Sequence, residues 1–276
     1  MYVTMKPPPG LQPFVARFWT NADDGQAASS GAVITREAVL PSGMAHLAIR
    51  LSDASFDISD SNGALRAGPM VACGLRSQPY YRLRGEPVIS VGVQLRPGAG
   101  PVLFGMPADE MADMHVPLDD LWGRFAHELR ERLAEAPTAD ERLTLFARLL
   151  ESRLQRARGM HPAVALALHR FADRVDVAAV VEETDYSHRH FNVLFRQAVG
   201  LSPKRYCRIL RFREALESLA ASPEQAPAEL ALDQGYSDQA HFNRDFRAFA
   251  HMTPGAYRRS RPNAVFHVPF EESEIP

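Results

Sequence analysis

The chain has 276 residues, of which 46% are hydrophobic and 23% are charged, and its formal net charge at pH 7 is −2. This composition is ordinary for a soluble globular protein, and the length is sufficient for two domains with separate cores. No apolar run is long enough to span a bilayer, and residues 1–10 lack the apolar core of a signal peptide. We therefore expect a cytoplasmic protein with no membrane partner.

Residues 1–118 are expected to form a β-rich domain, because short apolar runs alternate with turn signals such as Pro41-Ser42-Gly43 and Ser61-Asn62-Gly63. Many short strands at about 10-residue spacing favour an antiparallel barrel or sandwich, cupin-like or jelly-roll-like. Residues 7–10 are expected to be an extended lead-in, and 21–31 a polar loop. The expected strands or short buried elements are 11–20, 32–35, 39–40, 46–51, 56–58, 70–75, 80–84 and 88–95.

Residues 119–158 are expected to form a helical appendage and a linker. Two apolar stripes at helical spacing are separated by Pro137-Thr138, and Thr138 with Glu141 has the pattern of a capping box. Such a helix pair packs either on the β domain or on a second subunit, and packing on the β domain is the stronger prediction. The linker is expected at 156–159, and an acidic tail, in part poorly ordered, at 263–276.

Residues 159–262 contain an internal repeat with a period near 50. The pairs Tyr186-Ser187 and Tyr236-Ser237 are 50 apart, whereas the Phe-Asn and Phe-Arg pairs of the two copies are 51 apart. Each copy has the pattern of a short helix, a turn and a second helix whose Phe residues form a buried stripe. A long helix from Pro203 to Leu219 joins the copies. The fold class is therefore α+β multidomain, with two all-α helix-turn-helix units at the C-terminus.

The second helix of each copy is expected to lie in the major groove of DNA. Arg bridges guanine, and Asn or Gln bridges adenine, through two hydrogen bonds each. Residues 160–262 carry 14 Lys and Arg against 12 Asp and Glu, hence +2, so binding depends on placed Arg residues more than on a broad field. The predicted base contacts are His188, Arg189, Asn192, Gln239, Ala240, Asn243 and Arg244, and the predicted phosphate contacts are Ser187, Arg196, Lys204, Ser237 and Arg247.

Residues 160–261 resemble the DNA-binding domain of AraC/XylS-type bacterial transcription regulators. The resemblance is carried by the segments 200–206, 231–242, 246–247 and 253–258. It implies two recognition helices in successive major grooves, held by one long helix. The sequence departs from the family pattern at Asp185, where a left-handed turn residue is expected, and at His251, where Gly commonly ends the second recognition helix.

The N-terminal half resembles the N-terminal domains of one group of AraC-type regulators, through residues 40–47, 91–99 and 116–123. The resemblance implies a domain that senses a small molecule or mediates dimerisation. Double-stranded DNA and a small-molecule effector are the expected partners, and RNA polymerase and a second copy of this chain are further candidates. The candidate effector pocket comprises His46, Tyr80, Tyr81, Arg82 and Arg96, each of which is individually better explained as an ordinary surface or core-edge residue.

Catalytic motifs are not evident, because the sequence has no Gly-x-Ser-x-Gly, no phosphate-binding Gly-rich loop and no His-Glu-x-x-His. No Cys/His cluster has metal-ligand spacing along the chain, so neither a metal nor a cofactor is predicted, and Cys73 and Cys207 are interpreted as ordinary thiols. The leading hypothesis is an effector-responsive regulator. The alternatives are a regulator whose N-terminal domain only dimerises and, third, an enzyme that uses the β domain.

Overall fold

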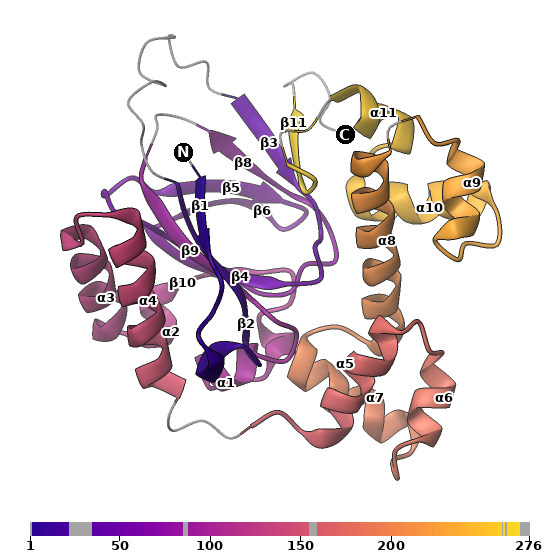
Figure 1. The fold of residues 1–276 in the computed structure, drawn as a ribbon, viewed down its shortest axis with the longest axis horizontal. Helices are drawn as coiled ribbons and strands as arrows, with labels where there is room; N and C mark the ends of the chain where they lie inside the picture. Colours follow the sequence, from indigo (N-terminus) through magenta and orange to yellow (C-terminus); the bar gives the residue numbers. More distant parts are fainter. Residues whose placement is uncertain are drawn as a thin grey trace.

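The computed structural model describes residues 2–21, 35–84, 88–154, 159–222, 224–260, 262 and 264–270. The β-rich N-terminal part lies on one side, and a column of helices lies along its other side (Figure 1). Residues 32–34 of the strand expected over 32–35, nearly all of the polar loop expected over 21–31, most of the expected linker and the end of the tail lie outside the described residues.

The N-terminal part contains two antiparallel sheets rather than the closed barrel that was one of the two expectations. Along the described strands, the first sheet has the order β1-β2-β9-β4-β7-β10 and the second has the order β11-β3-β8-β5-β6. The strands are β1 Tyr2–Met5, β2 Val15–Asn21, β3 Thr35–Val39, β4 Ala45–Arg50, β5 Phe56–Asp60, β6 Gly63–Ala67, β7 Met70–Cys73, β8 Tyr80–Arg84, β9 Ser90–Leu95, β10 His115–Pro117 and β11 His267–Phe270.

Alternation along the strands gives each sheet two different faces. On β7, Val71 and Cys73 pack between the sheets, while Met70 and Ala72 face the opposite way. The two sheets thus form a sandwich-like pair with a small shared core. Strand β11 comes from the segment that was expected to be a tail, and it pairs with β3 from His267 opposite Val39 onward.

The helical segment covers the outer face of the first sheet, as expected from its apolar stripes. It consists of α2 (Leu118–Trp122), α3 (Arg124–Glu135) and α4 (Ala139–Leu154). Phe146 of α4 packs edge-to-face on Phe18 of β2, with ring centroids 5.4 Å apart. Two short helices, η1 (Pro9–Leu11) and α1 (Gly100–Phe104), contribute buried side chains to the same core. Thr138 accepts a hydrogen bond from the Glu141 backbone N–H, the first half of the expected capping box.

The C-terminal part is helical throughout its described residues up to Ser260. The helices are α5 Pro162–Ala172, α6 Val177–Glu182, α7 His188–Val199, α8 Pro203–Ala221, α9 Pro227–Asp233, α10 Gln239–Ala250 and α11 Pro254–Ser260. Ser187 and Ser202 cap α7 and α8 as the sequence predicts, because their hydroxyls accept backbone N–H bonds from His190 and Arg205. Pro203 occupies the first turn of α8, where its missing N–H costs nothing.

The β-rich and helical parts share a continuous core. Ala38 and Leu40 lie on the outer face of the second sheet, and they pack into the cluster that contains Ile209 and Leu210 of α8. Helix α8 runs beside that sheet in Figure 1. A 3-10 turn, η3 (Ala108–Glu110), approaches the end of α7. The N-terminal part is therefore in direct contact with both α8 and α7.

Candidate nucleic-acid interface

Helices α7 and α10 have the same construction, 51 residues apart. Each buries a row of apolar side chains and leaves the opposite face to solvent; the buried rows are Phe191, Phe195 and Val199 in α7, and Phe242, Phe246 and Phe249 in α10. Both helices are strongly amphipathic by this pattern. Each begins at a side-chain N-cap, Ser187 or Asp238, and ends at a left-handed residue, Gly200 or His251.

His251 takes the conformation that Gly usually provides. Its φ of 54° matches the left-handed C-cap at Gly200, so the second recognition helix ends like the first despite the departure in sequence. The expectation for Asp185 was wrong. Positive φ occurs in the second turn at Gly235, which precedes Tyr236 as Asp185 precedes Tyr186, whereas neither Thr184 nor Asp185 has positive φ. The Thr184 hydroxyl instead donates to the Val181 carbonyl at 2.8 Å.

The structure places every predicted DNA-contacting residue at or near the solvent face of α7, of α10 or of the start of α8. Arg189 and Arg244 are exposed, and they are the second and sixth residues of their helices. Four residues along a helix rotate by about 40°, so the two side chains leave equivalent faces. The amide nitrogen of Asn192 donates to the His188 carbonyl at 2.8 Å, and both Asn192 and Asn243 are half-buried. The remaining predicted contacts, Ser187, His188, Arg196, Lys204, Ser237, Gln239, Ala240 and Arg247, are exposed.

Val193 is a residue that reasoning from residue types missed. It is 50% exposed on α7 and is the counterpart of Arg244 in the 51-residue register. An exposed apolar side chain on this face suits contact with a thymine methyl group. The internal repeat carried the signal, because aligning the copies on their Phe residues puts Val193 and Arg244 at one position.

Two basic side chains of α8, those of Arg208 and Arg211, contact the second unit rather than extend the exposed face. Arg208 pairs with the buried Asp245 of α10 at 2.7 Å, and the guanidinium of Arg211 lies 5.2 Å from the Tyr236 ring centroid. Arg174, which follows α5, pairs with Glu214 of α8 at 2.7 Å and donates to the Asp233 carbonyl of the second unit. These contacts hold the helix-turn-helix units against α8, the long helix that joins them.

The first unit also contacts the N-terminal part through η3. Asp109 forms an ion pair with Arg196 of α7 at 3.8 Å. Gly200, with φ of 101°, lets η3 approach, since a Cβ there would lie 3.1 Å from the Ala108 carbonyl oxygen. A cleft of about 560 Å³ opens beside this contact; its lining includes Met106, Met160, Leu194 and Gln197.

Three of the five candidate effector residues come together between the sheets. The Tyr80 hydroxyl lies 3.4 Å from Nε2 of His46, and Arg82 donates to Glu37 at 2.6 Å from the neighbouring strand. The structure places the other two elsewhere. Tyr81 faces the helices, with its hydroxyl 3.4 Å from Nδ1 of His251, and the exposed Arg96 donates to the Gln12 carbonyl.

Beside the apolar core, the side chains between the sheets around Tyr80 and Arg82 are polar, and their charges are compensated. Burial opposes ionisation of Glu37, but hydrogen bonds and charge from His267 and Arg82 outweigh it and lower the pKa of that carboxyl to about 2. Burial, reinforced by the charge of Arg82, lowers the pKa of His46 to about 3. This region therefore holds an ionised carboxylate beside neutral imidazole.

Among the described helices, none has the length and apolar character that a membrane crossing requires.

Comparison with known protein families gives two matches. Residues 180–260 match a family described as a helix-turn-helix domain, and residues 3–117 match a domain of unknown function, DUF6597. Among curated proteins, the HTH-type transcriptional activator RhaS of Escherichia coli strain SE11 is 32% identical over 143 residues, which covers 49% of this chain and 51% of RhaS. An uncharacterised HTH-type transcriptional regulator of Haemophilus influenzae is 31% identical over 84 residues, covering 30% of this chain and 28% of that protein.

Solved structures that align with this chain include those of ToxT of Vibrio cholerae. An unliganded ToxT variant has 13% identity and a TM-score of 0.46, covering 92% of this chain and 99% of that chain. ToxT bound to an unsaturated fatty acid gives 11% identity and a TM-score of 0.45, covering 83% and 95%. This chain spans about half the length of the curated RhaS relatives that it matches. The repeated helix-turn-helix units of this chain are thus similar to those of AraC/XylS-type bacterial transcription regulators, and the likeness to RhaS supports a regulator of this type.

Proposed function

We propose that the chain is a sequence-specific DNA-binding transcription regulator that inserts α7 and α10 into successive major grooves of double-stranded DNA. The observation that carries the proposal is the pair of equivalent, exposed helix faces fixed by one long helix, α8. Helix-turn-helix proteins bind in this way, with the second helix of each unit in the major groove.

The individual roles follow from position along each helix. Arg189 and Arg244 reach base edges in this proposal, and the half-buried Asn192 and Asn243 contribute from the same side. Val193 provides an apolar contact. Arg196 and Arg247 lie about two turns after the first residue of their helices. In this proposal they bind phosphates and fix the register. His188, Gln239 and Ala240 begin the faces that read bases, and Ser187, Ser237 and Lys204 flank them as phosphate contacts.

The proposal further assigns residues 1–118 a sensing role, residues 119–158 a supporting helical segment and residues 159–262 the DNA-binding role. Two features support sensing: the cluster of polar side chains between the sheets around Tyr80 and Arg82, and the contact of η3 with α7. A small molecule that binds between the sheets with different affinity in two arrangements would shift the position of α7. RNA polymerase and a second copy of the chain belong to the same proposal as partners.

Two variants test DNA recognition. Arg244→Ala is expected to relax the preference at one operator position at a cost of about 1–3 kcal/mol, whereas Arg247→Ala weakens operator and random DNA alike. The measurement is affinity for an operator, selected from the organism's own DNA, against random DNA over a range of salt concentrations. Equal losses on both DNAs for Arg244→Ala would contradict the base-reading role.

An alternative within the same class is an N-terminal part that only dimerises the regulator. It is separated from sensing by the melting temperature of the full chain across a broad metabolite set. A compound that raises this temperature and also changes operator affinity supports sensing. A chain that responds to none, yet sediments as a dimer, supports the alternative.

A further inference from the structure

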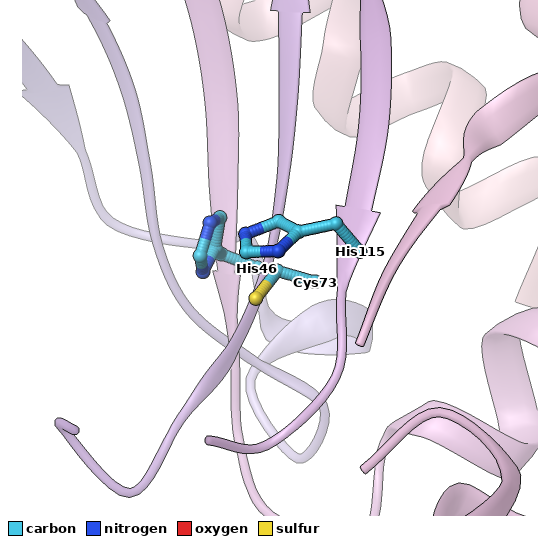
Figure 2. A group of neighbouring side chains, drawn as sticks. All are labelled: His46, Cys73 and His115. Carbon is cyan, nitrogen blue, oxygen red and sulfur yellow. The ribbon is translucent and has the colours of Figure 1, made fainter. Parts of the chain in front are cut away.

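Three side chains that are far apart in sequence meet in one row across the first sheet. His46 of β4 and His115 of β10 each lie directly opposite Cys73 of β7, the strand between them. Residues directly opposite one another on adjacent strands share a face of the sheet. Figure 2 shows the two imidazoles and the thiol converging from these strands.

We propose that His46, Cys73 and His115 bind a transition-metal ion of the Zn²⁺ class between the two sheets. One ligand atom from each residue lies within 4.8 Å of the others. Around a tetrahedral zinc ion with bonds of about 2.0–2.3 Å, ligand atoms are roughly 3.3–3.7 Å apart. Side-chain rotations that move the ligand atoms by about 1 Å therefore bring the three atoms to this spacing. Two imidazoles and a thiolate suit this ion better than they suit hard cations such as Mg²⁺ or Ca²⁺.

The condition of the ligands supports binding. Nε2 of His115 is buried and has no hydrogen-bond partner among the described residues, which a purely structural histidine would rarely tolerate. A neutral imidazole has one nitrogen with a lone pair, which is the atom that a metal needs. Cys73 is fully buried, and its thiol makes a long contact of 3.4 Å with the adjacent Gly74 carbonyl.

The charges nearby do not exclude a cation. Two guanidiniums, of Arg76 and Arg82, approach the site, but Arg76 pairs with Asp60 at 2.6 Å and lies 3.9 Å from Asp113. Arg82 in turn donates to Glu37. The imidazole of His267 also lies against Glu37, at 3.1 Å, so each of these basic groups has a carboxylate partner.

Binding requires a proton to leave. Cys73 is a free, buried cysteine, and it enters the binding step as a thiol. When the ion binds, the S–H bond breaks, the sulfur–metal bond forms and one proton is released to solvent. The three residues supply three ligands, so in this proposal a water or an anionic group completes the tetrahedron.

Cobalt binding to the full chain tests the proposal. Metal-free protein is titrated with Co²⁺, and the expected result is one equivalent bound, with a thiolate-to-cobalt charge-transfer band that Zn²⁺ abolishes by displacement. Cys73→Ala is expected to remove the band, and His115→Gln to keep it while weakening Co²⁺ affinity by at least about 100-fold. Cys207→Ser, which changes the only other cysteine, is the matched control and should leave both unchanged.

Circular dichroism and thermal unfolding of the metal-free proteins show whether each variant is folded. If Cys73→Ala does not fold, His46→Gln replaces it, with the same weakening of affinity expected as for His115→Gln. The absence of a charge-transfer band in the wild-type chain, its persistence in Cys73→Ala, or its loss in Cys207→Ser would overturn the proposal. DNA binding takes no part in these measurements, so their outcome is separate from that of the proposed function.

Discussion

The two helix-turn-helix units have nearly the same internal construction but different surroundings. In the first unit, the N-terminal part contacts the recognition helix itself, because η3 meets the end of α7 and Asp109 pairs with Arg196. The second unit is attached through β11, which follows it and extends the second sheet beside β3, and Tyr81 of β8 lies 3.4 Å from His251, the residue that ends α10. A repeated sequence therefore reproduces a local fold without reproducing its contacts.

The difference indicates where control of DNA binding would act. A rearrangement of the N-terminal part would reach α7 through η3 directly, whereas α10 is held by α8 through the Arg208–Asp245 pair. We therefore propose that α7 responds to the N-terminal part more strongly than α10 does. The contrast makes three predictions, which run from the largest expected effect to the smallest.

The attachment of the second unit is tested by Glu37→Gln. Glu37 contacts Arg82 and His267 of β11, and its pKa is lowered from 4.5 to about 2, so its stabilisation is present above pH 4.5 and is lost as pH falls towards 2. At pH 7 the substitution should lower the free energy of unfolding by about 3 kcal/mol, and at pH 3 by about 2 kcal/mol less than that. Urea unfolding at both pH values measures this.

A matched control for Glu37 is Asp57→Asn, because the Asp57–Arg66 pair is largely exposed and should contribute little at either pH. A stability loss for Glu37→Gln that is the same at pH 7 and pH 3 would contradict the assigned role of the carboxylate.

The two left-handed caps should respond in opposite directions. Gly200→Ala is expected to cost about 2 kcal/mol, because L-residues are strained at φ of 101° and the new Cβ crowds the Ala108 carbonyl. His251→Gly relieves strain at φ of 54° and should raise the free energy of unfolding by up to about 1 kcal/mol. Loss of the contact between His251 and Tyr81 reduces this gain. Thermal unfolding of both variants measures the contrast, and His251→Asn, which tolerates this conformation, should stay near wild type. Stabilisation by Gly200→Ala would show that the caps are not equivalent.

The smallest effect concerns the ion pair at η3. Asp109→Asn should release Arg196 for phosphate contact and raise DNA affinity about two- to five-fold at low salt, consistent with about 0.2–1 kcal/mol for a partly exposed pair. Glu110→Gln, on the same turn, is the control. Binding titrations with a fixed operator measure the change, and the gain should disappear in an Arg196→Ala background. A gain that survives there would assign the effect to net charge alone.

The helical part was largely predictable from local sequence. Apolar residues at helical spacing and the caps at Ser187 and Ser202 located α7 and α8, and the strand-rich pattern located most strands of the N-terminal part. The strands β1, β6 and β10 were not foreseen as separate elements. The segment 267–270 was expected within a partly ordered tail, but it forms β11, because its partner β3 is more than 200 residues away in sequence.

The sequence by itself determined the repeat, the buried Phe rows and the exposed polar faces, since these depend on spacing within about a dozen residues. Only the tertiary structure decided which distant side chains meet. It brought His46 and His115 to either side of Cys73, and it separated Tyr81 and Arg96 from the other candidate effector residues. The physical reason is strand pairing, which joins segments through backbone hydrogen bonds whose partners leave no periodic mark in the sequence.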